Sequence, residues 1–449
     1  MHISKRLLSV FETVLLAVST PFLLFPHVAP TATLLALLGL VVVWSVYWIV
    51  ERHPLPSTPM NGALLLWGVA VVVGIAVTAF PELTLPKATG LILGLAVWRY
   101  LVVMIQGQND FRWALVGSAA VGLGIMGLGA FSARWYYKVP GLQNLVTVLP
   151  PQLLSLPEAP QAGVSTNQLA GVVAFYLPVA LAAVLFFVER WGSRTAEPRR
   201  CGKAALGFLA SVAGVTAVGG LLILTQSRSG WVGGLVGVGA LLFAWGLFLP
   251  QRWGRYLSLG LVVTVIAVGA ILYWNGKLAQ IAALWDAAGG VKTELIGTVT
   301  LSGRVEIWSR ALYAVQDFPF TGCGLGTFRE VIWSLYPLFT ISPGHDIAHA
   351  HNIFLQTAVD VGLPGLLAYL ALLSLAGVIG VRMARRSAGE RALGLGIVAG
   401  LMALHIYGLT DALAPGSKPA LVFWIALGLL AARGRSTDWR DQGKDRLTG

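Results

Sequence analysis

The sequence contains few charged residues for its length. Asp, Glu, Lys and Arg make up 11% of the 449 residues, whereas hydrophobic residues make up 56%. Soluble globular proteins carry about 25% charged residues, so this composition excludes a water-soluble globule. The chain also lacks a convincing internal repeat, and residues 22–26 lack the small-residue pattern at which a signal peptide is cleaved. We therefore interpret it as a polytopic membrane protein that keeps its first apolar helix.

Apolar runs long enough to cross a bilayer recur along the whole chain. A hydrocarbon core of about 30 Å requires about 20 apolar residues in a helix. We expect an all-α fold with about twelve transmembrane helices that form a single integral membrane domain over residues 1–449. The expected spans lie at residues 7–25, 31–50, 62–80, 88–107, 112–131, 166–189, 204–225, 229–249, 256–275, 362–381, 392–410 and 417–433.

The basic residues are distributed unevenly between alternate joints. With both termini cytoplasmic, the inner segments hold 21 of the 31 Lys and Arg residues, and longer outer segments share the rest. This is the positive-inside asymmetry of membrane proteins. The formal net charge of +12 is therefore a topology signal, and nothing indicates a nucleic-acid partner. Because this topology places Cys201 inside and Cys323 outside, it excludes a disulfide between them, and neither is a credible nucleophile.

Two long segments, residues 132–165 and 276–361, are expected on the outer face. Long loops in a compact fold are usually functional or disordered. The first contains Arg134-Trp135-Tyr136-Tyr137-Lys138, which is typical of an anchor among membrane lipids at the interface and less so of a sugar platform. The second, partly helical loop carries a histidine cluster. The charged tail, residues 434–449, is expected to be cytoplasmic and disordered.

A polar stripe marks a short helix near the end of the second loop. Asn352, Gln356 and Asp360 recur at i, i+4 and i+8, so we expect them on one helical face, facing a wet cavity. The following Gly362-Leu363-Pro364-Gly365 is expected to bend this helix into the tenth span. Upstream, Gly322-Cys323-Gly324-Leu325-Gly326 lacks the Lys of a nucleotide-binding loop and is better interpreted as a tight turn.

Three of the seven histidines, His345, His349 and His351, lie within seven residues. One interpretation is that a neutral imidazole acts as a general base toward a hydroxyl group. A second is metal ligation, because His345-Asp346-Ile347-Ala348-His349 imitates the His-Glu-x-x-His of metalloproteases, although Ser342-Pro343-Gly344 upstream is not typical of a zinc-binding helix. The third is that the histidines cap or pack the loop.

Two arginines accompany the histidines on the expected outer face. Arg228 lies in the short joint after the seventh span, at the external interface, and Arg304 lies in the long loop. Guanidinium groups stay charged and bind two oxygens at once, so two of them suit a diphosphate at a membrane surface without a metal. The alternative is that Arg228 extends to lipid head groups and Arg304 is a solvated loop charge. Asn167, and Asp411 with Lys418, are candidates to line the same cavity, although helix capping also explains Asn167.

Several of these motifs together resemble the O-antigen ligase and O-antigen polymerase superfamily. They are Ser227-Arg228-Ser229-Gly230, Ser302-Gly303-Arg304, Gly322-Cys323-Gly324-Leu325-Gly326-Thr327-Phe328, His349-Ala350-His351-Asn352-Ile353-Phe354-Leu355-Gln356 and Asp360-Val361-Gly362-Leu363-Pro364-Gly365. The motif match covers about residues 165–375. Asp360 stands where the family usually has Glu.

The resemblance implies an inverting glycosyltransferase that takes a glycan from undecaprenyl diphosphate at the outer face of the bacterial cytoplasmic membrane. It implies no metal or other cofactor. Arg228 and Arg304 would hold the diphosphate, and His351 or His349 would activate the acceptor hydroxyl, with His351 favoured because Asn352 follows it. A ligase would use the lipid A core as acceptor, and a polymerase a second carrier-linked glycan; we favour the ligase.

Two other classes of protein compete with this interpretation. A transporter of lipid-linked glycans would also have about twelve spans, but transporters usually place polar residues at mid-bilayer and contain repeated halves. A membrane metalloprotease would use the histidine cluster as a zinc site.

Overall fold

The computed structural model describes the chain with several gaps. The described residues are 5–52, 55–108, 111–135, 137–139, 142–147, 149, 152–156, 164–192, 198–249, 252–277, 280, 301–342 and 345–434. The expected disordered tail lies outside these residues from position 435 onward, as do residues 278–279, 281–300 and 343–344 of the long loop.

The described residues form helices and no strands, which confirms the expected all-α fold. The helices are α1 (Lys5–Leu24), α2 (Pro30–Glu51), α3 (Asn61–Ala76), α4 (Pro81–Gln108), α5 (Phe111–Ser132), α6 (Gln143–Thr147), α7 (Thr166–Gly192), α8 (Pro198–Leu224), α9 (Arg228–Phe248), α10 (Arg252–Trp274), α13 (Leu301–Asp317), α14 (Phe328–Leu335), α15 (Ile353–Ala384), α16 (Ala388–Tyr407), the 3-10 turn η1 (Lys418–Ala420) and α17 (Leu421–Arg433).

Each of the twelve expected spans coincides with a helix, but two helices are shorter than expected. Within the described residues, ten helices are long and apolar enough to cross a membrane, in keeping with a multi-pass membrane protein. Helix α3 has 16 residues, and α17 has 13 because Lys418–Ala420 forms the 3-10 turn before it. At 1.5 Å per residue, α17 is about 20 Å long, short of the hydrocarbon core of about 30 Å.

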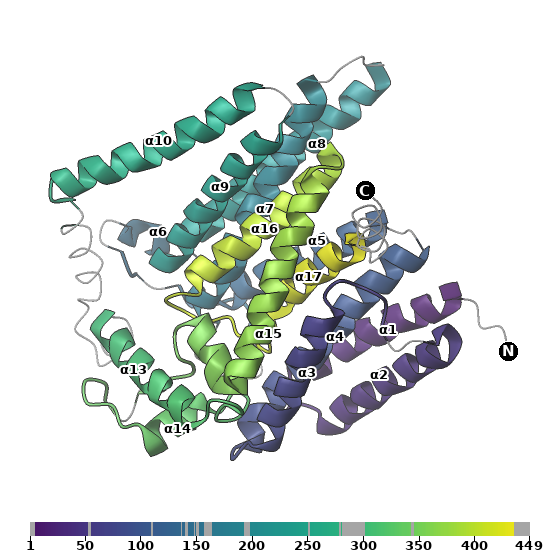
Figure 1. Ribbon diagram of the computed structural model, residues 1–449, viewed down its shortest axis with the longest axis vertical. Helices are drawn as coiled ribbons and strands as arrows, with labels where there is room; N and C mark the ends of the chain where they lie inside the picture. Colours follow the sequence, from purple (N-terminus) through teal and green to yellow (C-terminus); the bar gives the residue numbers. More distant parts are fainter. Residues whose placement is uncertain are drawn as a thin grey trace, which may run out of the picture.

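The helices form an elongated bundle with distinct ends (Figure 1). Helices α13 and α14 lie at one end, whereas α1 begins and α17 ends at the other. At the centre, α16 packs on α7 and α9, and α15 packs on α16 and α3. This arrangement brings the starts of α7, α9 and α15 and the joint after α16 to the same end as α13.

Helix α15 is broken at Gly362, which confirms the expected bend. Gly362 has φ +72° and ψ 178°, a conformation favoured by glycine. A Cβ atom there would lie 2.5 Å from the carbonyl oxygen of Phe320. The Leu363 N–H donates to the Pro319 oxygen at 2.7 Å, and the Cys323 N–H donates to the Val359 oxygen at 2.8 Å. The segment after α13 is therefore docked against the break.

The glycine-rich segment after α13 is the tight turn expected from its sequence. Gly322, Gly324 and Gly326 have φ values of +68°, +108° and +78°. Cys323 lies in this turn, and burial, together with the Asp360 and Asp317 carboxyls, raises the pKa of its thiol to about 12. The thiol is thus protonated and unreactive at neutral pH.

Arg99, which we counted among the 21 basic residues of the inner segments, lies inside the bundle instead. Arg99 of α4 is 1% exposed, and its Nη1 lies 2.5 Å from Oε1 of Glu12 in α1. Its guanidinium also lies 4.1 Å from the ring centroid of Tyr47 in α2. Arg99 therefore links α1 and α2 to α4. Because it is not a loop residue, the expected difference in basic charge between inner and outer loops depends on the other residues.

Candidate functional site

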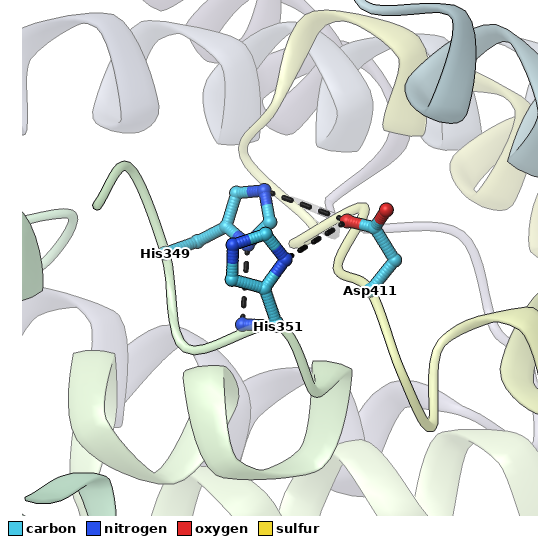
Figure 2. Close-up of side chains that lie close together, drawn as sticks. All are labelled: His349, His351 and Asp411. Atoms are coloured by element: carbon cyan, nitrogen blue, oxygen red, sulfur yellow. Dashed lines mark hydrogen bonds and ion pairs between the residues drawn. The ribbon is translucent and has the colours of Figure 1, made fainter. Parts of the chain in front are cut away.

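Two of the three clustered histidines meet an aspartate from a distant part of the chain. His349 Nε2 lies 3.5 Å, and His351 Nδ1 3.8 Å, from Oδ1 of Asp411 in the joint between α16 and η1 (Figure 2). The two imidazole centroids are 4.3 Å apart. His345 lies outside this group, so the expected trio of histidines is a pair with a carboxylate.

The backbone of residues 349–352 is held by hydrogen bonds on both sides. The indole N–H of Trp308 in α13 donates to the His351 carbonyl oxygen at 3.2 Å. His351 itself has φ +47°, an uncommon conformation for a residue with a side chain, which needs such support. Asn352 caps α15 by accepting from the Phe354 and Leu355 N–H groups, and its Nδ2 donates to the Leu409 oxygen at 3.1 Å.

The other residues of the polar stripe are buried and do not face an open cavity. Gln356 and Asp360 are 3% and 4% exposed. Gln356 accepts from the Ala350 N–H at 2.7 Å and donates to Oδ1 of Asp360 at 2.8 Å, and that oxygen also accepts from the Gly326 N–H at 2.9 Å. The expectation of a wet face is therefore wrong here, because these side chains satisfy the backbone of the histidine loop and of the glycine turn.

Hydrogen bonding distinguishes the two histidines. The His351 N–H donates to Nδ1 of His349 at 3.2 Å, so the proton of a neutral His349 is on Nε2, facing Asp411. Nδ1 of His351 is buried and has no hydrogen-bond partner among the described residues, whereas its Nε2 points to the side opposite Asp411 (Figure 2). His349 thus has both nitrogens engaged, whereas Nε2 of His351 faces away from Asp411.

Desolvation and neighbouring positive charge keep both imidazoles neutral. Burial, the His349 ring and the Arg304 guanidinium lower the pKa of His351 to about 3, against the opposing effect of Asp411. Burial also lowers the pKa of His349, with Lys87, Arg304 and Arg329 contributing. A neutral imidazole is the form that accepts a proton.

Asp411 is the only acidic group that faces the two imidazoles among the described residues. Burial alone would raise the pKa of its carboxyl, but the two imidazoles, the Arg304 guanidinium and the Ala412 N–H outweigh burial and lower this pKa. The Ala412 N–H donates to Oδ1 at 2.8 Å. Asp411 is therefore ionised and is placed to stabilise an imidazolium that forms beside it.

Three cations surround this group. Arg304 in α13 is 8% exposed, and Arg228 begins α9 directly after the cap Ser227. Lys138 is the third: its Nζ donates to Thr166 Oγ1 at 2.6 Å and Asn167 Oδ1 at 2.9 Å. Burial, opposed by Asp411 and reinforced by Arg228 and Arg304, lowers the pKa of Lys138 to about 8.

The structure brings most of the expected site residues together and adds one. One electrostatic environment contains the two arginines, the two histidines and the aspartate, namely Arg228, Arg304, His349, His351 and Asp411. Asn167 belongs to it through the hydrogen bond that its Oδ1 accepts from Lys138. Lys418 contacts a residue outside this environment: its Nζ lies 4.4 Å from the Phe25 ring centroid. Lys138 was missed as a site residue because its sequence context is that of an interfacial anchor, and only its place in a long outer segment hinted at a role.

The arrangement does not fit a metalloprotease. Residues 345–352 are not helical, and Asp346 is exposed and paired with Arg329 Nε at 2.8 Å. His349, His351 and Asp411 each place one ligand atom within 4.8 Å of the others. However, the bond that Nδ1 of His349 accepts puts the proton on Nε2, so that nitrogen lacks the lone pair a metal needs. The group therefore favours proton transfer.

Comparison with known families supplies the decisive observation. Residues 212–370 match the family model described as O-antigen ligase. Through this segment, the chain is similar to the O-antigen ligase and polymerase superfamily. Members of this superfamily are glycosyltransferase-like enzymes. None of the curated proteins compared with the chain matches it.

The matched segment does not contain all residues of the candidate site. Arg228, Arg304, His349 and His351 lie inside residues 212–370, whereas Lys138 and Asp411 lie outside it. The segments on either side of the family match therefore complete the environment of the histidines.

Proposed function

We propose that the protein is a membrane glycosyltransferase of the O-antigen ligase type. It would move a glycan from undecaprenyl diphosphate to a sugar hydroxyl of the lipid A core. The observation that carries the proposal is a neutral His351 imidazole beside an ionised Asp411, within the field of Arg228, Arg304 and Lys138. Such a group supplies a base for the acceptor and positive charge for the leaving diphosphate.

In the proposed reaction, Nε2 of His351 takes the proton of the acceptor hydroxyl while its oxygen forms a bond to the anomeric carbon of the donor. The bond between that carbon and the diphosphate oxygen breaks, and the diphosphate leaves with the electron pair. Attack from the opposite side inverts the anomeric configuration. Arg228, Arg304 and Lys138 offset the charge on the leaving group, so we expect the transfer to need no metal or other cofactor.

The cations also couple base strength to donor binding. With the diphosphate absent, burial, the His349 ring and the Arg304 guanidinium lower the pKa of His351 to about 3, so the imidazole is neutral but weakly basic. The diphosphate is an anion, so its binding beside the cations raises this pKa toward the range of an effective general base. The base would therefore gain strength when the donor is bound.

The proposal is tested with purified protein, a carrier-linked glycan and two separate acceptors. We expect glycosylated lipid A core and free undecaprenyl diphosphate in equal amounts, with activity retained in EDTA. Transfer to a second carrier-linked glycan alone would replace the ligase with a polymerase. Movement of intact donor across vesicles without release of the diphosphate would instead support a transporter.

The charge asymmetry supports a site on the outer face of the cytoplasmic membrane. Phe339, in the segment after α14, is 83% exposed at the site end of the bundle. A cysteine at this position in a Cys201→Ser background should react with a membrane-impermeant thiol reagent in cells with a permeabilised outer barrier. Protection of that cysteine until the cells are lysed would contradict the orientation.

Lys138 should give the transfer reaction an alkaline limit. Because the pKa of Lys138 is about 8, its ammonium loses the proton as pH rises through this value, and one positive charge is lost from the donor site. We expect kcat/KM for the carrier donor to fall several-fold by about pH 9. Lys138→Arg should abolish this fall, because arginine stays charged. An unchanged pH profile in the arginine variant would assign the limit to another group.

A further inference from the structure

Helix α10 is barely covered by the rest of the bundle. Of its apolar span, Gly254–Trp274, 6% is buried, the lowest share among the ten candidate spans of the described residues. Its close contacts with α9 lie near its start, where Ser258 Oγ donates to the Phe243 oxygen at 2.8 Å. A Cβ atom on Gly246 would lie 2.5 Å from the Gly254 oxygen. The two helices are therefore joined at the end of the bundle opposite the site.

Toward the site end, α9 and α10 diverge (Figure 1). Val232, Leu235 and Val236 of α9 are exposed there, and a Cβ atom built on Gly239 meets nothing within 4 Å. From Leu259 to Trp274, α10 is exposed except for half-buried Leu261 and Leu272. We call the apolar surface formed by residues 232–239 of α9 and residues 259–274 of α10 the α9–α10 wedge.

Arg228 lies at the open end of this wedge. Residues 228, 232, 235, 239, 243 and 246 follow one another at intervals of three or four, so they share one side of α9. The other sides of α9 are occupied, since Gly233 and Gly237 approach Ala403 of α16 and Gly234 approaches Leu222 of α8. An apolar surface therefore begins one turn after residue 228 and runs along the side of α9 that contacts α10.

We propose that the α9–α10 wedge binds the polyprenyl chain of the carrier lipid, next to the diphosphate held by Arg228. This inference rests on the proposed function and adds the place where the lipid part of the donor lies. The longer side of the wedge, residues 259–274 of α10, is about 24 Å long at 1.5 Å per residue, so the wedge offers a path along much of a hydrocarbon core of about 30 Å. A cation at the mouth and an open apolar surface behind it match an anionic head on a long hydrocarbon chain.

The experiment compares two phenylalanine variants and two donors. Gly239→Phe fills the wedge, whereas Gly124→Phe places the same side chain on the exposed side of α5, which packs on α7, α4 and α17 and not on the wedge helices. An added Cβ meets nothing within 4 Å at either position. The donors carry the same glycan diphosphate on either undecaprenol or a short, water-soluble prenyl chain. For the undecaprenyl donor, we expect Gly239→Phe to raise KM about tenfold or more, because loss of burial of two methylene groups already corresponds to about a tenfold change in affinity. KM for the short donor should stay unchanged, and Gly124→Phe should behave as the parent.

Each other outcome is informative. An unchanged KM for the undecaprenyl donor in Gly239→Phe would mean that ordinary membrane lipid alone covers the wedge and would overturn the inference. An equal loss with both donors would show damage to the site or the fold, and would also overturn it. Absence of transfer by the parent protein with either donor would instead contradict the proposed function.

Discussion

Replacement of His351 by alanine is expected to lower the rate of glycan transfer by roughly a hundred-fold to ten-thousand-fold, the range of a general base. The reason is that Nε2 of His351 points away from Asp411 (Figure 2), and we propose that the acceptor hydroxyl binds on that side. Single-turnover transfer from a carrier-linked glycan measures the chemical step. His345→Ala is the matched control, because this histidine belongs to the same loop but lies outside the group formed with Asp411.

His349→Ala should reduce transfer less than His351→Ala. His349 accepts the His351 N–H and faces Asp411, so it positions the loop and does not receive the acceptor proton. A substantial effect on KM with a smaller effect on kcat would fit this role. Parent-like activity in His351→Ala, or a larger defect in His349→Ala, would remove His351 from the base assignment.

Substitution of lysine for Arg304 is the second large expected effect, with transfer falling about a hundred-fold, near the lower end for loss of one donor to a developing anion. Arg304 is 8% exposed, and its Nε is buried without a hydrogen-bond partner among the described residues. Lysine keeps the charge but loses the fork that binds two oxygens. Arg228→Lys should act in the same direction.

Arg310→Lys provides the control for this substitution on the same helix. Arg310 donates from Nε to the Pro337 oxygen at 3.0 Å and lies 3.6 Å from Glu306, so its contacts stabilise the segment after α14. We expect near-normal transfer in this variant. Full activity in both Arg304→Lys and Arg228→Lys would mean that these residues contact only lipid head groups and solvent.

Local sequence features predicted the helices and the part of the candidate site that lies in recognisable motifs. The His349-Ala350-His351-Asn352 motif and Arg304 lie on segments with clear helical or turn signals, so their neighbourhood followed from the sequence. The breaks at Gly362 and in the glycine turn were also predictable, because these positions need φ values that glycine adopts at low cost.

The contacts of the histidines were less predictable: the sequence made Asp411 a candidate to line the same cavity, but it did not predict that Asp411 pairs with them. Asp411 and Lys138 are separated from His351 by long stretches of chain, and their approach depends on how α16 and α7 pack in the bundle. The polar stripe was misjudged for a related reason. Spacing shows that Gln356 and Asp360 share a helical face, but only the packed structure shows that backbone groups of Ala350 and Gly326 occupy that face.

The position of Lys138 and Asp411 outside the matched segment has a consequence for chimeric proteins. An exchange of residues 212–370 between two members of the superfamily would transplant the arginines and histidines but leave the host's lysine and carboxylate in place. Such a hybrid would acquire a base without its native counter-charge, even where every transplanted helix packs well. Functional recombination would therefore require the crossover points to include both the joint after α16 and the segment before α7.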